Sequence, residues 1–130
     1  MPGLVRGQAR TGGSKTGRRF KTPETKLYEN RVAEVAAVIM RGHPLFDGPL
    51  SLTLVARMMI PDSRSKKWKA DAAAGRAYPT VKPDWDNIAK ITDAMTGIVW
   101  KDDKQIVFGS VAKQYAAVPG LYVIVKEILP

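Results

Sequence analysis

The residues best suited to chemistry gather between Lys82 and Asp103, where the sequence reads KPDWDNIAKITDAMTGIVWKDD. Carboxylates that share one site repel each other and raise each other's pKa, so a group of them needs a compensating cation. Lys90 supplies part of that charge, and a divalent cation such as Mg²⁺, which prefers oxygen ligands and water, supplies more. The carboxylates of this stretch are Asp84, Asp86, Asp93, Asp102 and Asp103.

The spacing of the first carboxylates predicts how they are presented. Pro83 favours an extended chain before it, and in extended chain residues two apart point to the same side, so Asp84 and Asp86 are expected to face one way. Asp86 is expected to be the N-cap of a helix that Asn87 opens. Lys90 follows Asp86 by four residues, one helical turn, and is expected to reach back toward the carboxylates.

An apolar stripe predicts the extent of that helix. Ile88, Ile91 and Met95 recur at helical spacing and form one buried face, and Gly97 is a suitable C-terminal stop. The predicted helix covers Asp86–Thr96. The apolar run 98–100 then leads to Asp102 and Asp103, whose side chains face opposite ways in extended chain, so one metal ligand is expected there rather than two.

Each of these residues also has a plain structural interpretation. Asp86 alone fits a helix cap, Lys90 a surface partner one turn away, and the Asp102–Asp103 pair a solvated turn. Charged residues are mostly exposed for no special reason. The combination of all of them within one short stretch favours the metal site.

The two segments PDWDNIAK and WKDDKQI resemble the RusA family of Holliday junction resolvases, whose pattern is PD-x-DN-x-x-K followed by W-x-DD-x-Q. The resemblance implies that Asp84, Asp86 and Asp103 are metal ligands and that Lys90 is catalytic. It implies Mg²⁺ as the metal, with Mn²⁺ as the alternative. It also implies a homodimer that acts on branched DNA, the four-way junction, in the cytoplasm of a bacterium or of a phage-infected host.

Composition restricts the classes of protein. The chain has 130 residues, a net charge of +9, no cysteine and a single histidine, His43. Disulfides, thiolate metal sites and His-rich zinc sites are therefore excluded, and any metal is held mainly by oxygen. No apolar run approaches the ~20 residues of a membrane span, and no N-terminal signal is visible, which predicts a soluble, intracellular protein without a membrane partner.

The positive charge is concentrated in two segments that we expect to contact DNA phosphates. One is a basic arm, residues 1–21, in which Val5–Arg10 resembles a Gly-Arg-Pro-Arg-like segment of the family and the preceding strand is short. The other is a basic loop, residues 61–82, where Trp68 and Tyr78 are interleaved with cations and suit base stacking, with a mobile surface loop as the alternative. The candidate DNA-binding residues are Arg6, Arg10, Arg18, Arg19, Lys21, Arg64, Lys66, Lys67, Lys69 and Arg76.

The remaining periodicities predict a single α+β domain over residues 1–130, with a mixed sheet of about four strands covered by two main helices, as in the RusA family. The first helix is expected over Thr22–Arg41. Residues 49–60 alternate as a long central strand, and residues 105–116 and 121–128 are expected to form a C-terminal hairpin. A short helix is expected over Ala70–Ala77, and a small hairpin around Gly12–Gly13. The apolar stripe of the first helix is Leu27, Tyr28, Val32, Val35, Ala36 and Ile39.

The function predicted from these features is metal-assisted hydrolysis of DNA phosphodiester bonds at four-way junctions. Two alternatives remain open. One is a basic, non-catalytic nucleic-acid-binding module, whose binding would fall steeply with salt but would not depend on Mg²⁺. The other is a nuclease that acts on flaps or other branched DNA.

Overall fold

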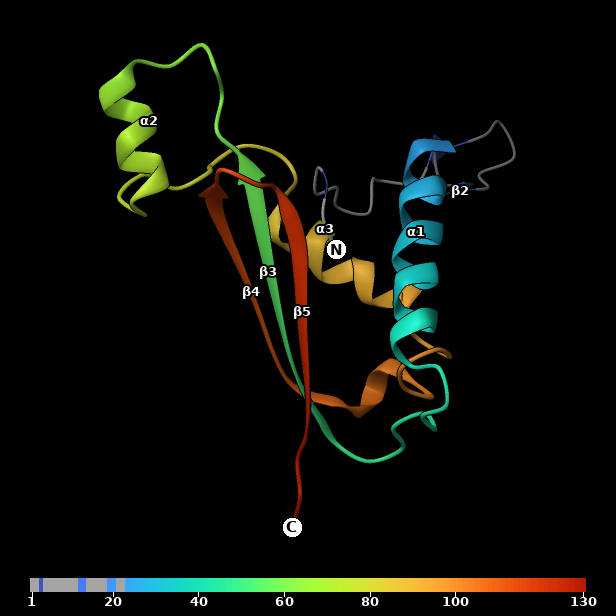
Figure 1. The fold of residues 1–130 in the computed structure, drawn as a ribbon. Coiled ribbons are helices and arrows are strands. Elements are labelled where there is room, and N and C mark those ends of the chain that lie inside the picture. The colour runs from blue at the N-terminus through green and yellow to red at the C-terminus, as the bar shows by residue number, and fades with distance from the viewer. Residues whose placement is uncertain (1–2, 4–11, 14–18, 21–22) are drawn as a thin grey trace.

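A three-stranded mixed sheet forms the centre of the fold (Figure 1). The computed structural model describes residue 3 and residues 12–13, 19–20 and 23–130. The middle strand is β3, Leu50–Met59, which pairs in parallel with β4, Ile106–Ala116, and antiparallel with β5, Gly120–Glu127. β3 buries alternate residues, which confirms the predicted central strand with one apolar face.

The C-terminal hairpin predicted from the sequence is wrong. β3 lies between β4 and β5, so the chain leaves β4, crosses the end of β3 and returns along its other side. On this side Leu121, Val123 and Val125 line up with the buried residues of β3 and extend the same apolar face. A turn at Val118–Pro119 is compatible with either connection, so burial of β5 against the core decides the strand order.

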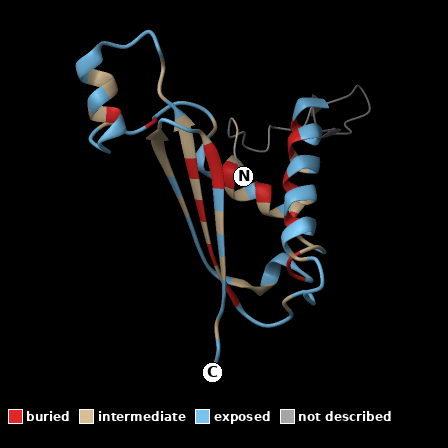
Figure 2. Cartoon of the chain, in the orientation of Figure 1, coloured by how far each residue is buried: buried red, intermediate tan, exposed pale blue. Residues whose placement is uncertain are grey.

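Two helical segments cover one face of the sheet. α1 spans Pro23–Ile39, and α3 spans Trp85–Ala89 and continues as a 3₁₀ helix over Lys90–Ala94. Figure 2 shows that the buried residues follow the inner sides of α1, α3 and β3. The core is the cluster Tyr28, Val32, Ala36, Leu50, Leu52, Leu54, Ala56, Ile88, Ile91, Met95, Val99, Trp100 and Leu121.

The α+β class is confirmed, but the details differ from the prediction. The main sheet has three strands rather than four. A separate antiparallel pair joins β1, Gly12–Gly13, to β2, Arg19–Phe20, at the place where a small hairpin was predicted. The helix predicted over Asp86–Thr96 is a five-residue α helix followed by a tighter 3₁₀ segment. Gly97 ends it with a φ of +85°, as predicted.

The basic loop contains α2, Lys66–Ala73, which begins earlier than the predicted Ala70–Ala77. Ser65 caps it by accepting a hydrogen bond from the backbone N–H of Trp68 at 3.2 Å. In Figure 1, α2 lies near the C-terminal end of β4, away from α1. Among the described residues, no helix is both long and apolar enough to cross a membrane.

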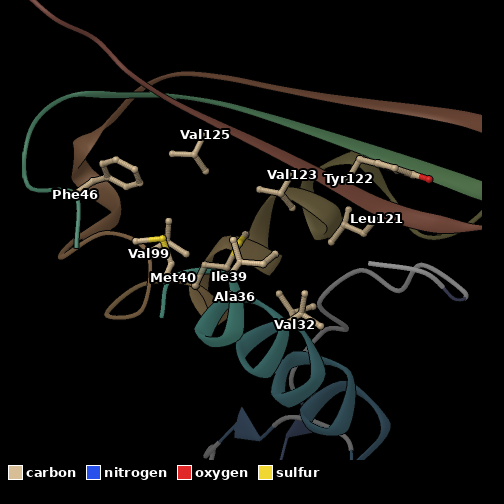
Figure 3. A pocket seen from close by; sticks show the side chains of 12 residues that line it. Val32, Ala36, Ile39, Met40, Phe46, Val99, Leu121, Tyr122, Val123 and Val125 are labelled. Carbon is tan, nitrogen blue, oxygen red and sulfur yellow. The ribbon is translucent and has the colours of Figure 1, made fainter. Parts of the chain in front are cut away.

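An apolar cavity of about 420 Å³ opens between α1 and β5 (Figure 3). Part of the stripe predicted for α1 is exposed: Leu27 and Ile39 are 65% and 75% exposed, and Ile39 lines the cavity, whereas Tyr28 and Val32 are buried. The side chains lining the cavity are hydrocarbon, apart from the thioethers of its methionines and the Tyr122 hydroxyl. None of the predicted metal ligands borders it, so the cavity is separate from the residues considered below.

Candidate metal and DNA site

Asp84, Asp86 and Lys90 lie on the short helix α3, between its N-cap and its C-cap. Asp84 is in the N-cap position, with extended backbone (φ −68°, ψ 153°), and its side chain makes no capping hydrogen bond. Asp86 lies in the first turn instead, so its predicted role as the N-cap is wrong by two residues. Lys90 Nζ is 4.0 Å from Asp86 Oδ2, as the spacing predicted. All three groups are exposed, which leaves the carboxylate oxygens accessible to a cation.

The position of this group is fixed by packing on either side. Ile88 and Ile91 are fully buried beneath it and Met95 is 3% exposed, which confirms the predicted apolar face. Trp85 Nε1 donates a hydrogen bond to the backbone oxygen of Val111 at 3.1 Å and so holds the first turn of α3 against β4. Just before α3, Lys113 Nζ donates to the backbone oxygen of Val81 at 2.5 Å. α3 is thus attached to the outer edge of the sheet at the level of residues 111–113.

The second acidic segment forms a 3₁₀ turn, Asp103–Gln105, directly before β4. Asp102 caps this turn: its carboxylate accepts from the backbone N–H of Lys104 at 3.0 Å, while Gln105 Oε1 accepts from the backbone N–H of Asp102 at 2.8 Å. The same Gln105 donates from Nε2 to the backbone oxygens of Phe46 and Gly48. The turn is therefore tied to the segment that leads into β3.

The two adjacent aspartates, Asp102 and Asp103, differ in their hydrogen bonding. The pKa of Asp102 lies below its ordinary value of 3.8, chiefly because its carboxylate accepts the backbone hydrogen bond from Lys104. Desolvation raises the pKa, whereas a side-chain hydrogen bond with Asp103 and the positive charge of Lys104 lower it further. Asp102 is engaged as a cap, and Asp103 follows it as the first residue of the turn, with its side chain exposed. This arrangement favours Asp103 over Asp102 as the residue that binds a ligand.

Asp103 does not join Asp84 and Asp86 within the chain. Ile106 and Val111 are five positions apart on β4, which at about 3.3 Å per residue separates them by roughly 16 Å. Asp103 precedes Ile106, while α3 is held at Val111, and Figure 1 shows the two segments at different levels of the sheet. In the part of the chain that the structure describes, no three His, Asp or Glu side chains are placed to hold one metal ion.

The candidate DNA-binding residues of the basic loop fall into two groups. Lys69 lies 3.9 Å from Asp62, and Arg76 forms a 3.0 Å ion pair with Asp71, so these cations have acidic partners. Lys66 and Lys67 are exposed at the start of α2. Arg6, Arg10, Arg18 and Lys21 lie outside the described residues, and of Arg19 only the backbone is described.

Trp68 is packed rather than open for base stacking. The Arg64 guanidinium lies 4.5 Å from the centre of its ring, and the Tyr115 ring meets it edge-on at 5.3 Å. These contacts anchor α2 to the end of β4. Arg64 is thereby held on the indole and remains an exposed residue.

Three residues of the site have structural roles that the sequence analysis did not predict. Gln105 fixes the acidic turn, Trp85 attaches α3 to β4, and Lys113 holds the segment before α3. The signal for Gln105 was present, because Asp102 and Gln105 have the spacing of a capping box. The partners of Trp85 and Lys113 lie 26 and 32 residues away along the chain, and no local pattern identifies them.

Comparisons with known proteins agree with this arrangement of motifs. The family model described as endodeoxyribonuclease RusA matches residues 2–126, nearly the whole chain. The uncharacterized protein YqaN of Bacillus subtilis (strain 168) is 35% identical over 108 residues, which cover 81% of this chain and 75% of YqaN.

Proposed function

Because this chain belongs to the RusA family of endodeoxyribonucleases, we propose that it resolves four-way DNA junctions in recombination and repair by Mg²⁺-dependent hydrolysis of phosphodiester bonds. The observation that carries the proposal is the exposed pair Asp84 and Asp86 beside Lys90, on a basic chain of net charge +9. Long-range attraction by that charge draws in a polyanion, and the carboxylates give the site a local preference for a cation.

The donor set suits a hard cation. Asp84 has no capping bond to give up, Asp86 is exposed, and the chain has no cysteine. Mg²⁺ is usually held by one or two carboxylates together with water and phosphate oxygens, and Mn²⁺ accepts the same ligands. Such an ion supplies Lewis-acid activation of the phosphate and of the attacking water.

The residues of this chain then bind and orient the substrate. Asp84 and Asp86 hold the cation, and Lys90 lies within ion-pair distance of Asp86, where its charge stabilises the negative charge that develops on the phosphate oxygens. Lys66, Lys67 and Arg64 on and before α2 contact the phosphates of a DNA arm. The arginines and Lys21 of residues 1–21 are proposed to contact a further arm.

The third carboxylate is proposed to come from a second copy of the chain. Among the described residues of one chain, Asp103 forms no three-carboxylate metal group with Asp84 and Asp86, whereas a two-fold partner can bring its own Asp103 close. The exposed apolar residues Val107 and Phe108 follow the turn that carries Asp103, with only Ile106 between. A partner subunit that covers them therefore also approaches Asp103. Two sites related by a two-fold axis also suit the two symmetric strands cut in a four-way junction.

The assignment is tested with Asp84→Asn and Asp86→Asn. Each variant should lose cleavage of a four-way junction in Mg²⁺ by at least a hundredfold while binding the junction as well as the unmodified protein or better, because a charge that repels phosphate is removed. Asp93→Asn makes the same chemical change on the same helical stretch and should cleave normally. Asn variants at positions 84 and 86 that cleave as well as the unmodified protein would contradict the proposal.

A gel assay of DNA cleavage distinguishes the alternative functions. A four-way junction, a flap and a plain duplex are each incubated with and without Mg²⁺. Cleavage of the junction alone supports the proposed function, and preferred cleavage of the flap indicates a nuclease for other branched DNA. Salt-sensitive binding without any metal-dependent cleavage would indicate a non-catalytic binding module.

A further inference from the structure

Trp85 lies between the two carboxylates of the site and presents a large aromatic ring to solvent. It is the first residue of α3 and is 56% exposed. The hydrogen bond from its Nε1 to the backbone oxygen of Val111 attaches one edge of the indole to β4. The ring therefore has a fixed point of attachment to the sheet edge while more than half of the residue remains accessible.

The other tryptophans of the chain are used for packing. Trp100 is fully buried and donates from Nε1 to Thr96 Oγ1, and Trp68 is covered by Arg64 and Tyr115. Leaving a ring of this size in water forgoes the free energy that burial of its apolar area provides. The α3 packing onto the core is already supplied by Ile88 and Ile91, so core packing does not account for the exposed part of Trp85.

The surroundings of the ring point to a nucleobase as its partner. Asp84 and Asp86 adjoin it in sequence, and an ion held there draws a phosphate to the start of α3. A base attached next to that phosphate is within reach of the ring. In continuous duplex each base is stacked between its neighbours, whereas at the branch point of a junction a base can leave the stack and lie on an aromatic side chain.

We propose that Trp85 stacks on an unstacked base at the branch point and so positions the adjoining phosphate at Asp84 and Asp86. The proposal rests on the proposed function. It makes Trp85 a positioning residue that favours branched over continuous DNA. The indole N–H bond to Val111 sets the place of the ring, and its exposed surface provides the contact.

The test pairs changes in the protein with changes in the DNA. Binding is measured with Ca²⁺ in place of Mg²⁺, because Ca²⁺ binds the same oxygen ligands in a looser geometry that does not suit cleavage, for four-way junctions that carry either normal nucleotides or one abasic nucleotide at each position flanking the branch point. The unmodified protein should bind the normal junction about tenfold more tightly than the best-placed abasic junction, a difference of ~1.4 kcal/mol. Trp85→Ala should bind both equally, with the weaker affinity.

Trp85→Phe separates stacking from the hydrogen bond. Phe lacks the indole N–H but keeps a ring, so it should retain most of the preference for the normal junction. Tyr122→Ala removes a 42% exposed aromatic from β5, the strand at the opposite edge of the sheet, and should leave the preference unchanged. Near-ultraviolet circular dichroism checks that each variant is folded.

Two results would overturn the proposal. One is an unmodified protein that binds normal and abasic junctions equally at every flanking position, and this holds whether or not Trp85→Ala folds. The other is a Trp85→Ala variant that sediments as a monomer where the unmodified protein is a dimer, which would assign the ring to the contact between subunits. An unmodified protein that shows no preference for junctions over duplex in these assays would refute the proposed function itself.

Discussion

The adjacent residues Asp102 and Asp103 have different surroundings, although they are the same residue type and belong to the same turn before β4. Asp102 accepts a backbone hydrogen bond from Lys104 and receives support from Gln105, so its carboxylate has a structural task. Asp103, the next residue, is exposed on the first position of the turn. Asp84 differs from Asp102 in this respect. It occupies the N-cap position of α3, but its side chain makes no capping hydrogen bond.

The cap at Asp102 predicts a pH-dependent contribution to stability. The folded-state pKa of Asp102 is lowered below 3.8, so its ionised form is stabilised by folding; this contribution is fully present above the unfolded pKa and is lost as the pH falls through the folded one. Asp102→Ala should therefore be less stable than the unmodified protein at pH 6, and the gap should shrink below about pH 4. Urea unfolding at a series of pH values measures it.

Asp102→Asn is the control for that experiment. Its amide oxygen can still accept the hydrogen bond from Lys104, so its stability at pH 6 should lie between that of the unmodified protein and that of Asp102→Ala. A stability gap for Asp102→Ala that does not change with pH would show that the ionised carboxylate contributes nothing as a cap. Junction cleavage by Asp102→Asn should remain, in contrast to Asp103→Asn.

Much of the residue-scale chemistry follows from local spacing. The Asp86–Lys90 contact, the buried face of Ile88 and Ile91 and the stop at Gly97 were predicted because each depends on residues within two helical turns. The N-cap was misplaced by two residues, since Asp84 and Asp86 have equal cap propensity and nothing in the local sequence decides between them. Packing of Trp85 against β4 favours the earlier start.

At the scale of elements, α2 is the part of the basic loop best placed to bind DNA. Trp68 fixes the helix to Tyr115 at the end of β4, and its exposed side carries Lys66 and Lys67. Lys69 and Arg76 have acidic partners and are expected to contribute less to phosphate binding. The basic loop therefore contains an anchored helix, in contrast to the mobile loop that its composition alone allowed.

The exposed lysines of α2 are expected to contribute to the salt dependence of junction binding. Each phosphate contact contributes about 0.9 to the slope of log binding constant against log salt concentration, so the double variant Lys66→Ala/Lys67→Ala should lower the magnitude of the slope by about 2. Lys26→Ala/Lys126→Ala removes the same charge from α1 and β5 and should change the slope by less than 1. Fluorescence anisotropy with a labelled junction, titrated at several salt concentrations, measures both. Equal slopes for the two double variants would contradict the role of α2.

Strand order is the element-scale feature that the sequence did not predict. The strands themselves were located to within about one residue, because alternation of apolar residues is a local property. Their neighbours are decided by long-range burial: β5 adds Leu121 and Val123 to the core beside β3, and this leaves β4 at the edge that receives Trp85. The two acidic segments are separated along the length of β4, because one precedes its first residue and the other is attached at Val111.

At the scale of the whole molecule, the positions of the aspartates favour a metal site formed by two subunits together. Asp84 and Asp103 are nineteen positions apart in the sequence, which is compatible with a compact cluster, but the structure puts a length of β4 between Asp103 and α3. No local pattern encodes that separation, so the sequence alone predicted three ligands within one chain. A ligand supplied by Asp103 of the partner subunit keeps all three assignments and makes activity depend on the dimer.

Heterodimers give a direct test of the shared site. Asp84→Asn and Asp103→Asn chains with different affinity tags are co-expressed, and the mixed dimer is isolated. If Asp103 acts across the interface, one site of the mixed dimer carries both substitutions and the other carries none. Nicking of a junction should then return to about half of the unmodified rate, although each variant alone is inactive.

The matched control is the mixed dimer of Asp84→Asn with Asp86→Asn. Both positions lie on the same α3, so every site carries one substitution whichever chain supplies Asp103, and this dimer should remain inactive. If the site is instead completed within one chain, the first mixed dimer also carries one substitution in each site and is equally inactive. Restored nicking by the first pair but not by the second therefore requires that carboxylates of two chains act on one phosphate, because no arrangement within a single chain leaves one site intact.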